Sequence, residues 1–150
     1  MAYSDTSLEN NLHIQNTRKP LTKKEKEVIN LVASQENACH YCLSAHTIIG
    51  KINGLTDEQI LEIRSGSASF DRRLNALVHF TYEVTALKGN IAKEATDNFL
   101  AAGYTKNNIA DVIITVADKI AMNYLHNLPQ APTDFSLVPN KLTTNTIDHS

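Results

Sequence analysis

Apolar residues in the central part of the chain recur every three or four positions, which is the spacing of an amphipathic helix. Val28, Leu31 and Val32 follow this spacing, and Leu74 and Leu77 continue it in a later segment. No segment keeps the alternation of apolar and polar residues that a half-buried strand requires. The pattern therefore predicts an all-α fold, a single-domain bundle of about six or seven helices.

Capping and turn residues mark where these helices begin and end. Thr22 followed by Glu25 has the spacing of a capping box, and Thr56 followed by Gln59 repeats it. Asn37 is a suitable N-cap for the second helix. The last helix is the most apolar, and we expect it to be buried most of the way round. The predicted helices span, approximately, residues 22–36, 37–52, 56–64, 70–88, 92–102 and 105–128.

The two ends of the chain are polar and weakly patterned. We expect residues 1–20 to form a partly helical N-terminal segment that is closed by Pro20. Residues 21–128 form the predicted helical domain, and a single core is sufficient for a chain of 150 residues. Residues 129–150 are rich in Pro and Thr and are expected to be an extended tail.

Charge and hydropathy exclude several classes of partner. The net charge is −2 and the sequence pI is about 6.3, so the chain offers no basic field for nucleic acid. No apolar run approaches the length of a membrane span, and the first residues lack the pattern of a signal peptide. We therefore expect a cytoplasmic protein with neither a nucleic acid nor a membrane as partner.

The chemistry of the chain is concentrated around its two cysteines. Cys39 and Cys42 form a C-x-x-C pair, and His46 follows four residues later. On a helix these three residues fall within an arc of roughly 60°. Two cysteines so close in sequence cannot connect distant parts of a fold, and a reducing cytosol would keep a structural pair as thiols. Three explanations for the pair remain, namely redox chemistry, metal binding or coincidence.

A thiolate and a nearby base are what this arrangement offers. A cysteine at a helix N-terminus is favoured as thiolate, and His46 has the i,i+4 spacing needed to accept the proton of Cys42. We therefore assign Cys42 as the nucleophile and Cys39 as the thiol that closes on it. A peroxide would oxidise Cys42 to sulfenic acid, Cys39 would condense with it to a disulfide, and an external dithiol would reduce that disulfide.

A histidine base works better with an orienting carboxylate, and Glu27 is a candidate. On one straight helix Glu27 would lie about 18 Å from Cys39. It can reach the stripe formed by Cys39, Cys42 and His46 only if the chain turns near residues 35–38. Asn37 indicates such a turn.

Zinc binding is the main alternative for these residues. The two cysteines and His46 could act as ligands, and Glu27 or His126 could complete the set. Structural zinc sites usually draw their ligands from two separated clusters, however, whereas this stripe lies within two turns of one helix. We therefore expect neither a metal nor a cofactor. His40 and His79 are interpreted as a surface residue and a half-buried helix residue.

Glu27, the C-x-x-C pair and His46 resemble the core signature of the carboxymuconolactone decarboxylase-like superfamily, on its alkylhydroperoxidase D-like branch. That signature is a Glu, a C-x-x-C pair starting twelve residues later, three residues and a His. The resemblance extends from about residue 21 to the end. It includes the segments Ala45-His46-Thr47, Ala101-Ala102-Gly103-Tyr104 and Asn123-Tyr124-Leu125-His126.

The resemblance implies an all-helical obligate oligomer, a trimer or a hexamer, with peroxidase activity. It implies that Glu27 and His46 form a proton relay, that Cys42 passes through sulfenic acid and that Cys39 resolves it. Peroxide would be the substrate, and a dithiol or a thioredoxin-like protein the reductant. Two positions near the pair differ from relatives. Ala38 replaces a common Gly, and Tyr41 stands where some members carry a further His.

The leading hypothesis is therefore a thiol-dependent peroxidase of antioxidant defence, similar to alkyl hydroperoxide reductases. Tyr41 and His126 are further candidates for lining its pocket, the latter because of its family-like segment. Two alternatives stay open. One is a lactone decarboxylase of the carboxymuconolactone type, which needs proton transfer rather than thiols. The other is a redox-responsive oligomer without enzymatic activity.

Overall fold

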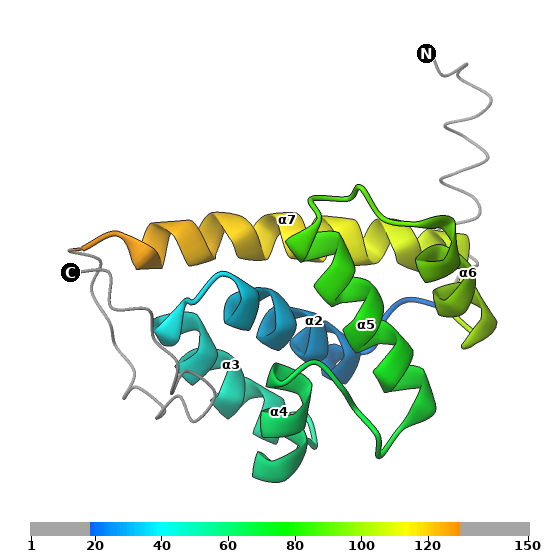
Figure 1. The fold of residues 1–150 in the computed structure, drawn as a ribbon. Coiled ribbons are helices and arrows are strands. Elements are labelled where there is room, and N and C mark those ends of the chain that lie inside the picture. Colours follow the sequence, from blue (N-terminus) through cyan, green and yellow to red (C-terminus); the bar gives the residue numbers. More distant parts are fainter. Residues whose placement is uncertain (1–18, 130–150) are drawn as a thin grey trace.

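The structure is a computed structural model that describes residues 19–129. The expectations for residues 1–18 and 130–150, including a partly helical start and an extended tail, lie outside the described residues. The described part contains six helices and no strand, so the predicted all-α fold is confirmed (Figure 1). The helices are α2 (Lys23–Glu36), α3 (His40–Ile52), α4 (Asp57–Arg64), α5 (Arg72–Ala86), α6 (Lys93–Ala101) and α7 (Lys106–Asn127).

Side-chain caps fix where several helices begin. Thr22 accepts a hydrogen bond from the Glu25 N–H, and the Glu25 carboxylate accepts one from the Thr22 N–H, each at 3.1 Å. Thr56 forms the second predicted capping box, at the start of α4. A third box at Thr105 begins α7. Each box satisfies backbone donors that a helix N-terminus otherwise leaves unpaired.

Helix α2 occupies the centre of the bundle. It lies between α7 on one side and α4 on the other, and it also packs against α3 and α5 (Figure 1). Val28, Ile29 and Leu31 are fully buried because they point to different neighbours. Burial of one such side chain contributes about 1.5–3 kcal/mol. This central position brings residues of α2 close to the start of α3.

An aromatic stack joins α5, α6 and the segment before α7. The rings of Phe80 and Phe99 stack with their centroids 4.3 Å apart, and Tyr104 stacks on the other side of Phe99 at 4.4 Å. The Arg73 guanidinium lies over the Tyr104 ring, 4.3 Å from its centroid. These contacts position α6 and lead the chain into α7.

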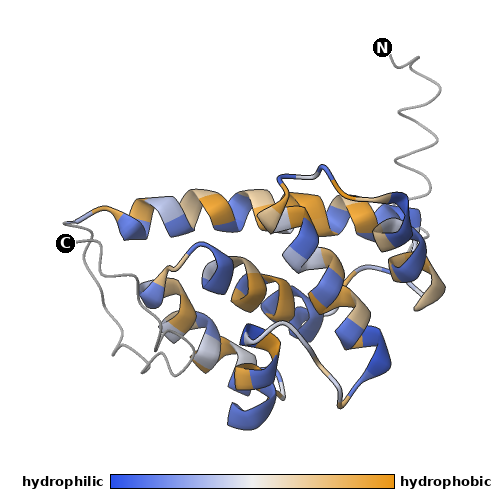
Figure 2. Ribbon diagram, in the orientation of Figure 1, coloured by the Kyte–Doolittle hydropathy of each residue, from blue (hydrophilic) through white to orange (hydrophobic). Residues whose placement is uncertain are grey.

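Helix α7 departs from its predicted burial. Only four of its residues are buried, namely Asn108, Val112, Val116 and Asn123. The opposite face exposes large apolar side chains. Figure 2 shows that apolar residues recur along the whole length of α7. The expectation that this helix is buried most of the way round is therefore wrong for the single chain, because α2 and α5 cover only one side of it. The exposed apolar residues on α7 are Ile113, Ile114, Met122, Tyr124 and Leu125.

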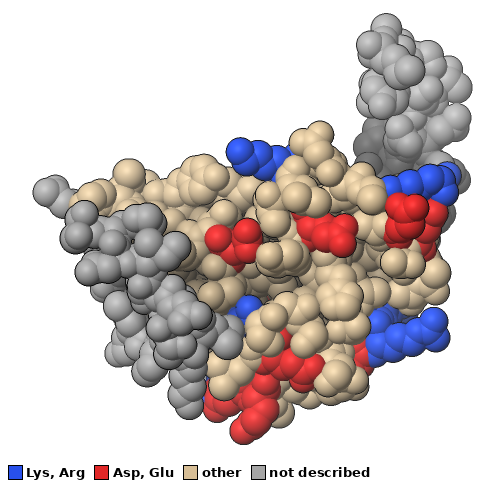
Figure 3. All heavy atoms as spheres, viewed as in Figure 1, with Lys and Arg blue, Asp and Glu red and all other residues tan. Residues whose placement is uncertain are grey.

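The charged surface is divided into small groups. On the face drawn in Figure 3, basic and acidic side chains form small groups, some of them adjoining, between broad uncharged areas. No helix in residues 19–129 has both the length and the apolar character needed to cross a membrane.

Candidate active site

The turn between α2 and α3 places the cysteine pair. Helix α2 ends in a Schellman motif, in which the Cys39 N–H donates to the Ser34 carbonyl at 3.0 Å and the Ala38 N–H donates to the Gln35 carbonyl at 3.2 Å. Ala38 takes the left-handed conformation that the motif requires, with φ of 50°. The expected turn is present, but Asn37 caps the end of α2 and does not begin α3.

Cys39 itself is the N-cap of α3. Its sulfur accepts a hydrogen bond from the Cys42 N–H at 3.3 Å. The two cysteines are joined as a disulfide, with their Cα atoms 5.2 Å apart. The structure therefore shows the oxidised form of the pair at the N-terminus of a helix, where the backbone N–H groups favour a thiolate after reduction.

Glu27 reaches His46 across the interface between α2 and α3. Its Oε2 lies 2.6 Å from His46 Nδ1, and Asn30 Nδ2 donates to Oε1 at 3.1 Å. A carboxylate can only accept, so Nδ1 of the ring donates and Nε2 is the nitrogen that can take up a proton. Both side chains are about one-tenth exposed. The carboxylate thus fixes the orientation and tautomer of the imidazole.

Both sulfurs are covered within the single chain. Cys39 has no exposed surface, and Cys42 is 3% exposed. Neither cysteine lines any of the three hollows described below. Within the described chain, a reactant can therefore meet the sulfurs only after the groups that cover them move.

Tyr41 and His126, the two further candidates for a pocket, lie in contact with each other. Tyr41 is on the first turn of α3, between the two cysteines in sequence, and its ring stacks on His126 of α7 with the centroids 4.0 Å apart. Nδ1 of His126 is buried without a hydrogen-bond partner. The stack places a second imidazole near Tyr41, one of the two residues between the cysteines.

Three asparagines hold the C-terminal end of α7 against the turn before Cys39, and the sequence does not predict their contacts with one another. Asn37 Nδ2 donates to Asn123 Oδ1 at 3.1 Å, and Asn127 Nδ2 donates to the Asn37 carbonyl at 2.8 Å. Asn123 Nδ2 also donates to Ser34 Oγ at 3.1 Å. We call Asn37, Asn123 and Asn127 the asparagine bridge. Its partners are up to 90 positions apart, so no local pattern signals it.

A polar hollow between α2 and α7 opens on Glu27. Its volume is about 530 Å³, and Asn30 and Lys119 share its lining with the carboxylate. Lys119 was also missed from the sequence, where it resembles an ordinary solvated charge. A second, more apolar hollow of about 480 Å³ lies between α5 and α7, where Asn37 and Val116 are among its lining residues.

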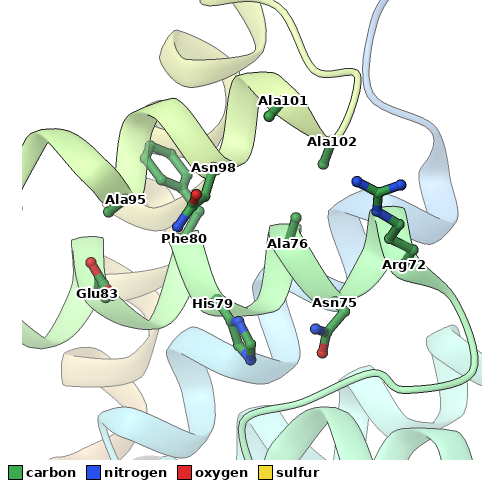
Figure 4. Close-up of a pocket in the computed structure, with 10 residues that line it drawn as sticks. All are labelled: Arg72, Asn75, Ala76, His79, Phe80, Glu83, Ala95, Asn98, Ala101 and Ala102. Atoms are coloured by element: carbon green, nitrogen blue, oxygen red, sulfur yellow. The ribbon is translucent and has the colours of Figure 1, made fainter.

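A third hollow lies between α5 and α6, and its polar side chains point in different directions. It measures about 360 Å³ (Figure 4). Arg72 lies at one end near Ala102, whereas Asn75 and His79 point away from α6. Asn75 Oδ1 already accepts a hydrogen bond from the Ala68 N–H at 2.8 Å.

The remaining candidate histidines lie on the surface of the molecule. His40 is exposed as expected, but His79 is exposed rather than half-buried. In residues 19–129 no three His, Cys, Asp or Glu side chains gather in a way that could hold a metal ion. The sulfurs of the stripe bind each other in this structure.

The geometry agrees with a comparison with known families. The sequence model of the carboxymuconolactone decarboxylase family matches residues 7–83, about half of the chain. The chain belongs to the carboxymuconolactone decarboxylase family. The matched part of this family member contains the disulfide, Glu27 and His46, and it ends before α6 and α7. No curated protein matches the chain.

Proposed function

We propose that this member of the carboxymuconolactone decarboxylase family is a thiol-dependent peroxidase of the alkylhydroperoxidase D-like type. One observation carries the proposal. A Cys39–Cys42 disulfide lies at the N-terminus of α3, and His46, one turn further along the same helix, pairs with the buried Glu27 of α2. A pair that alternates between dithiol and disulfide next to an oriented base is what peroxide reduction requires.

The reaction starts from the reduced pair. His46 takes the proton of Cys42, and the thiolate sulfur attacks one oxygen of the peroxide. The O–O bond breaks as the S–O bond forms, which gives Cys42 sulfenic acid. The proton held by His46 passes to the departing alkoxide, so that an alcohol leaves. Glu27 stabilises the imidazolium during this step.

The second half of the cycle restores the disulfide and then the dithiol. The Cys39 thiol attacks the Cys42 sulfenic sulfur, the disulfide forms and water leaves. An external dithiol then reduces the disulfide by exchange and becomes oxidised itself. A small dithiol or a thioredoxin-like protein in the cytoplasm would serve as that reductant. Because both sulfurs are buried, each exchange needs the first turn of α3 to open.

Peroxide consumption in the presence of a dithiol tests the proposal. We expect Cys42→Ser to abolish turnover, because the nucleophile is lost. Cys39→Ser should lose steady turnover and leave Cys42 open to over-oxidation, which mass spectrometry detects as sulfinic acid. His40→Ala, on the same turn but exposed, is the matched control and should keep the wild-type rate. Unchanged rates in both cysteine variants would refute a thiol mechanism.

The family membership supports one alternative reaction. Proton transfer by Glu27 and His46 would suffice for a lactone decarboxylase, without the thiols. Lactone turnover in the double Cys39→Ser, Cys42→Ser variant would favour that reaction. A redox-responsive oligomer without turnover is the other alternative, supported by the exposed apolar face of α7. A change of assembly on reduction, with no peroxide consumption, would favour it.

A further inference from the structure

The hollow between α2 and α7 contains a charged group for which the proposed reaction has no role. Lys119 is half-buried there and shares the lining of the hollow with Glu27. Burial lowers the pKa of the Lys119 ammonium, whereas the carboxylates of Glu27 and Asp118 act in the opposite direction. A lysine that is partly withdrawn from water beside a buried carboxylate is more than a solubilising charge.

The charges that share this hollow come from two helices. Helix α2 supplies Glu27 and the exposed Lys26, and α7 supplies Asp111 and Asp118 together with Lys119. From α3, His46 Nδ1 contacts Oε2 of the same Glu27 carboxylate. Helix α5 contributes no residue to the described lining. Lys119 is thus the only half-buried cation of the described lining.

The Glu27–His46 contact creates a chemical problem that a cation can solve. A carboxylate 2.6 Å from Nδ1 stabilises the imidazolium. The base must both accept a proton and release it during the reaction. A positive charge beside the carboxylate weakens its hold on the imidazolium proton.

We propose that Lys119 is a positioning residue of this site: its ammonium, in the hollow that opens on Glu27, offsets part of the carboxylate's charge and keeps His46 able to accept a proton. The inference rests on the proposed role of His46 as the base. Loss of the cation makes every neighbouring group retain its proton to higher pH. The direction of the effect is therefore the same for the imidazole and for the thiol–imidazole pair.

The titration of His46 in the oxidised protein tests this role without any turnover. The imidazole nitrogens are followed by NMR against pH in wild type and in Lys119→Met. We expect the midpoint to move to higher pH by about half a unit or more, the scale of one nearby charge in partly solvated surroundings. Lys119→Arg, which keeps the charge, should return the midpoint to the wild-type value.

Lys26→Met is the matched control, because it removes the same charge from the exposed rim of the same hollow. It should move the midpoint clearly less than Lys119→Met. An unchanged midpoint in a folded Lys119→Met protein would overturn the proposal, as would equal shifts in the two variants. Lys119→Gln provides a second neutral variant if the Met side chain perturbs the fold.

The same variants, reduced, give the second measurement. The acid limb of the rate of peroxide consumption against pH should move upward in Lys119→Met and return in Lys119→Arg. A purely structural role would lower the thermal midpoint without moving either titration. Failure of the peroxidase proposal is separable, because it is read from the cysteine variants, whereas the His46 midpoint is measured with the disulfide intact.

Discussion

Ala38 is the residue at which the chain reverses between α2 and α3. Its left-handed conformation, with φ of 50°, lets the Schellman motif close and makes Cys39 the N-cap of the next helix. An L-residue with a Cβ pays roughly 1–2 kcal/mol in this region. The strain is located one residue before the reactive pair, and the hydrogen bonds of the turn offset it.

Substitutions at Ala38 test that strain. Ala38→Gly removes the Cβ penalty but adds freedom to the unfolded chain, so we expect the free energy of unfolding to rise by up to about 1 kcal/mol. Ala38→Val introduces a β-branched side chain at the same φ and should lower it by more than about 1 kcal/mol. Urea unfolding of both variants, with the disulfide intact, measures the two changes. A Gly variant that is less stable than the Val variant would contradict this account.

At the scale of helices, the asparagine bridge connects the end of α7 to the turn before the cysteines. Asn123 is fully buried and uses both ends of its amide, as acceptor for Asn37 and as donor to Ser34. A buried amide that is fully paired specifies one arrangement of the elements around it. The bridge therefore fixes where α3 begins relative to α7.

Truncation of Asn123 should be costly. Asn123→Ala leaves the Asn37 amide and the Ser34 hydroxyl without their partners, so we expect the free energy of unfolding to fall by about 1–3 kcal/mol. Asn127→Ala removes one exposed hydrogen bond and should cost clearly less. Chemical unfolding of the two variants provides the comparison. Equal losses in the two variants would show that burial of the Asn123 amide does not increase its contribution to the free energy of unfolding.

The parts of this site that sequence could predict are those set by local spacing. The C-x-x-C pair and His46 belong to one helix, and capping boxes at Thr22 and Thr56 depend on residues three positions apart, so each was found. The contact of Glu27 with His46 needs a turn between the two helices, and the sequence predicts that turn. Asn37, however, is the C-cap of α2 and not the predicted N-cap of α3. Lys119 and the asparagine bridge depend on how α7 packs against α2, and local patterns carry no information about that packing.

At the scale of the whole molecule, the exposed face of α7 is the main feature that a single chain leaves unexplained. Ile114 is 61% exposed, Tyr124 60% and Leu125 52%, all on one side of a long helix. A contiguous apolar area of this kind is typical of a surface that meets another protein. We propose that this face lies between copies of the chain in the oligomer that the family resemblance implies.

Charge placed on that face should separate the copies. We expect Leu125→Glu to reduce the assembly to a smaller species in light scattering after size exclusion, because a buried carboxylate without a partner is unfavourable. Tyr82→Glu, also exposed but on α5, is the comparison variant. A wild-type protein that is monomeric at all concentrations would overturn the proposal.

The burial of both sulfurs sets a limit on how fast the pair can be regenerated. Thiol exchange needs the attacking sulfur to approach along the axis of the disulfide, and within the single chain that approach is closed. Reduction must then wait for a local opening of the first turn of α3. Raising the dithiol concentration should accelerate reduction only up to a plateau, and the height of that plateau is the opening rate of the helix start, whichever reductant is used.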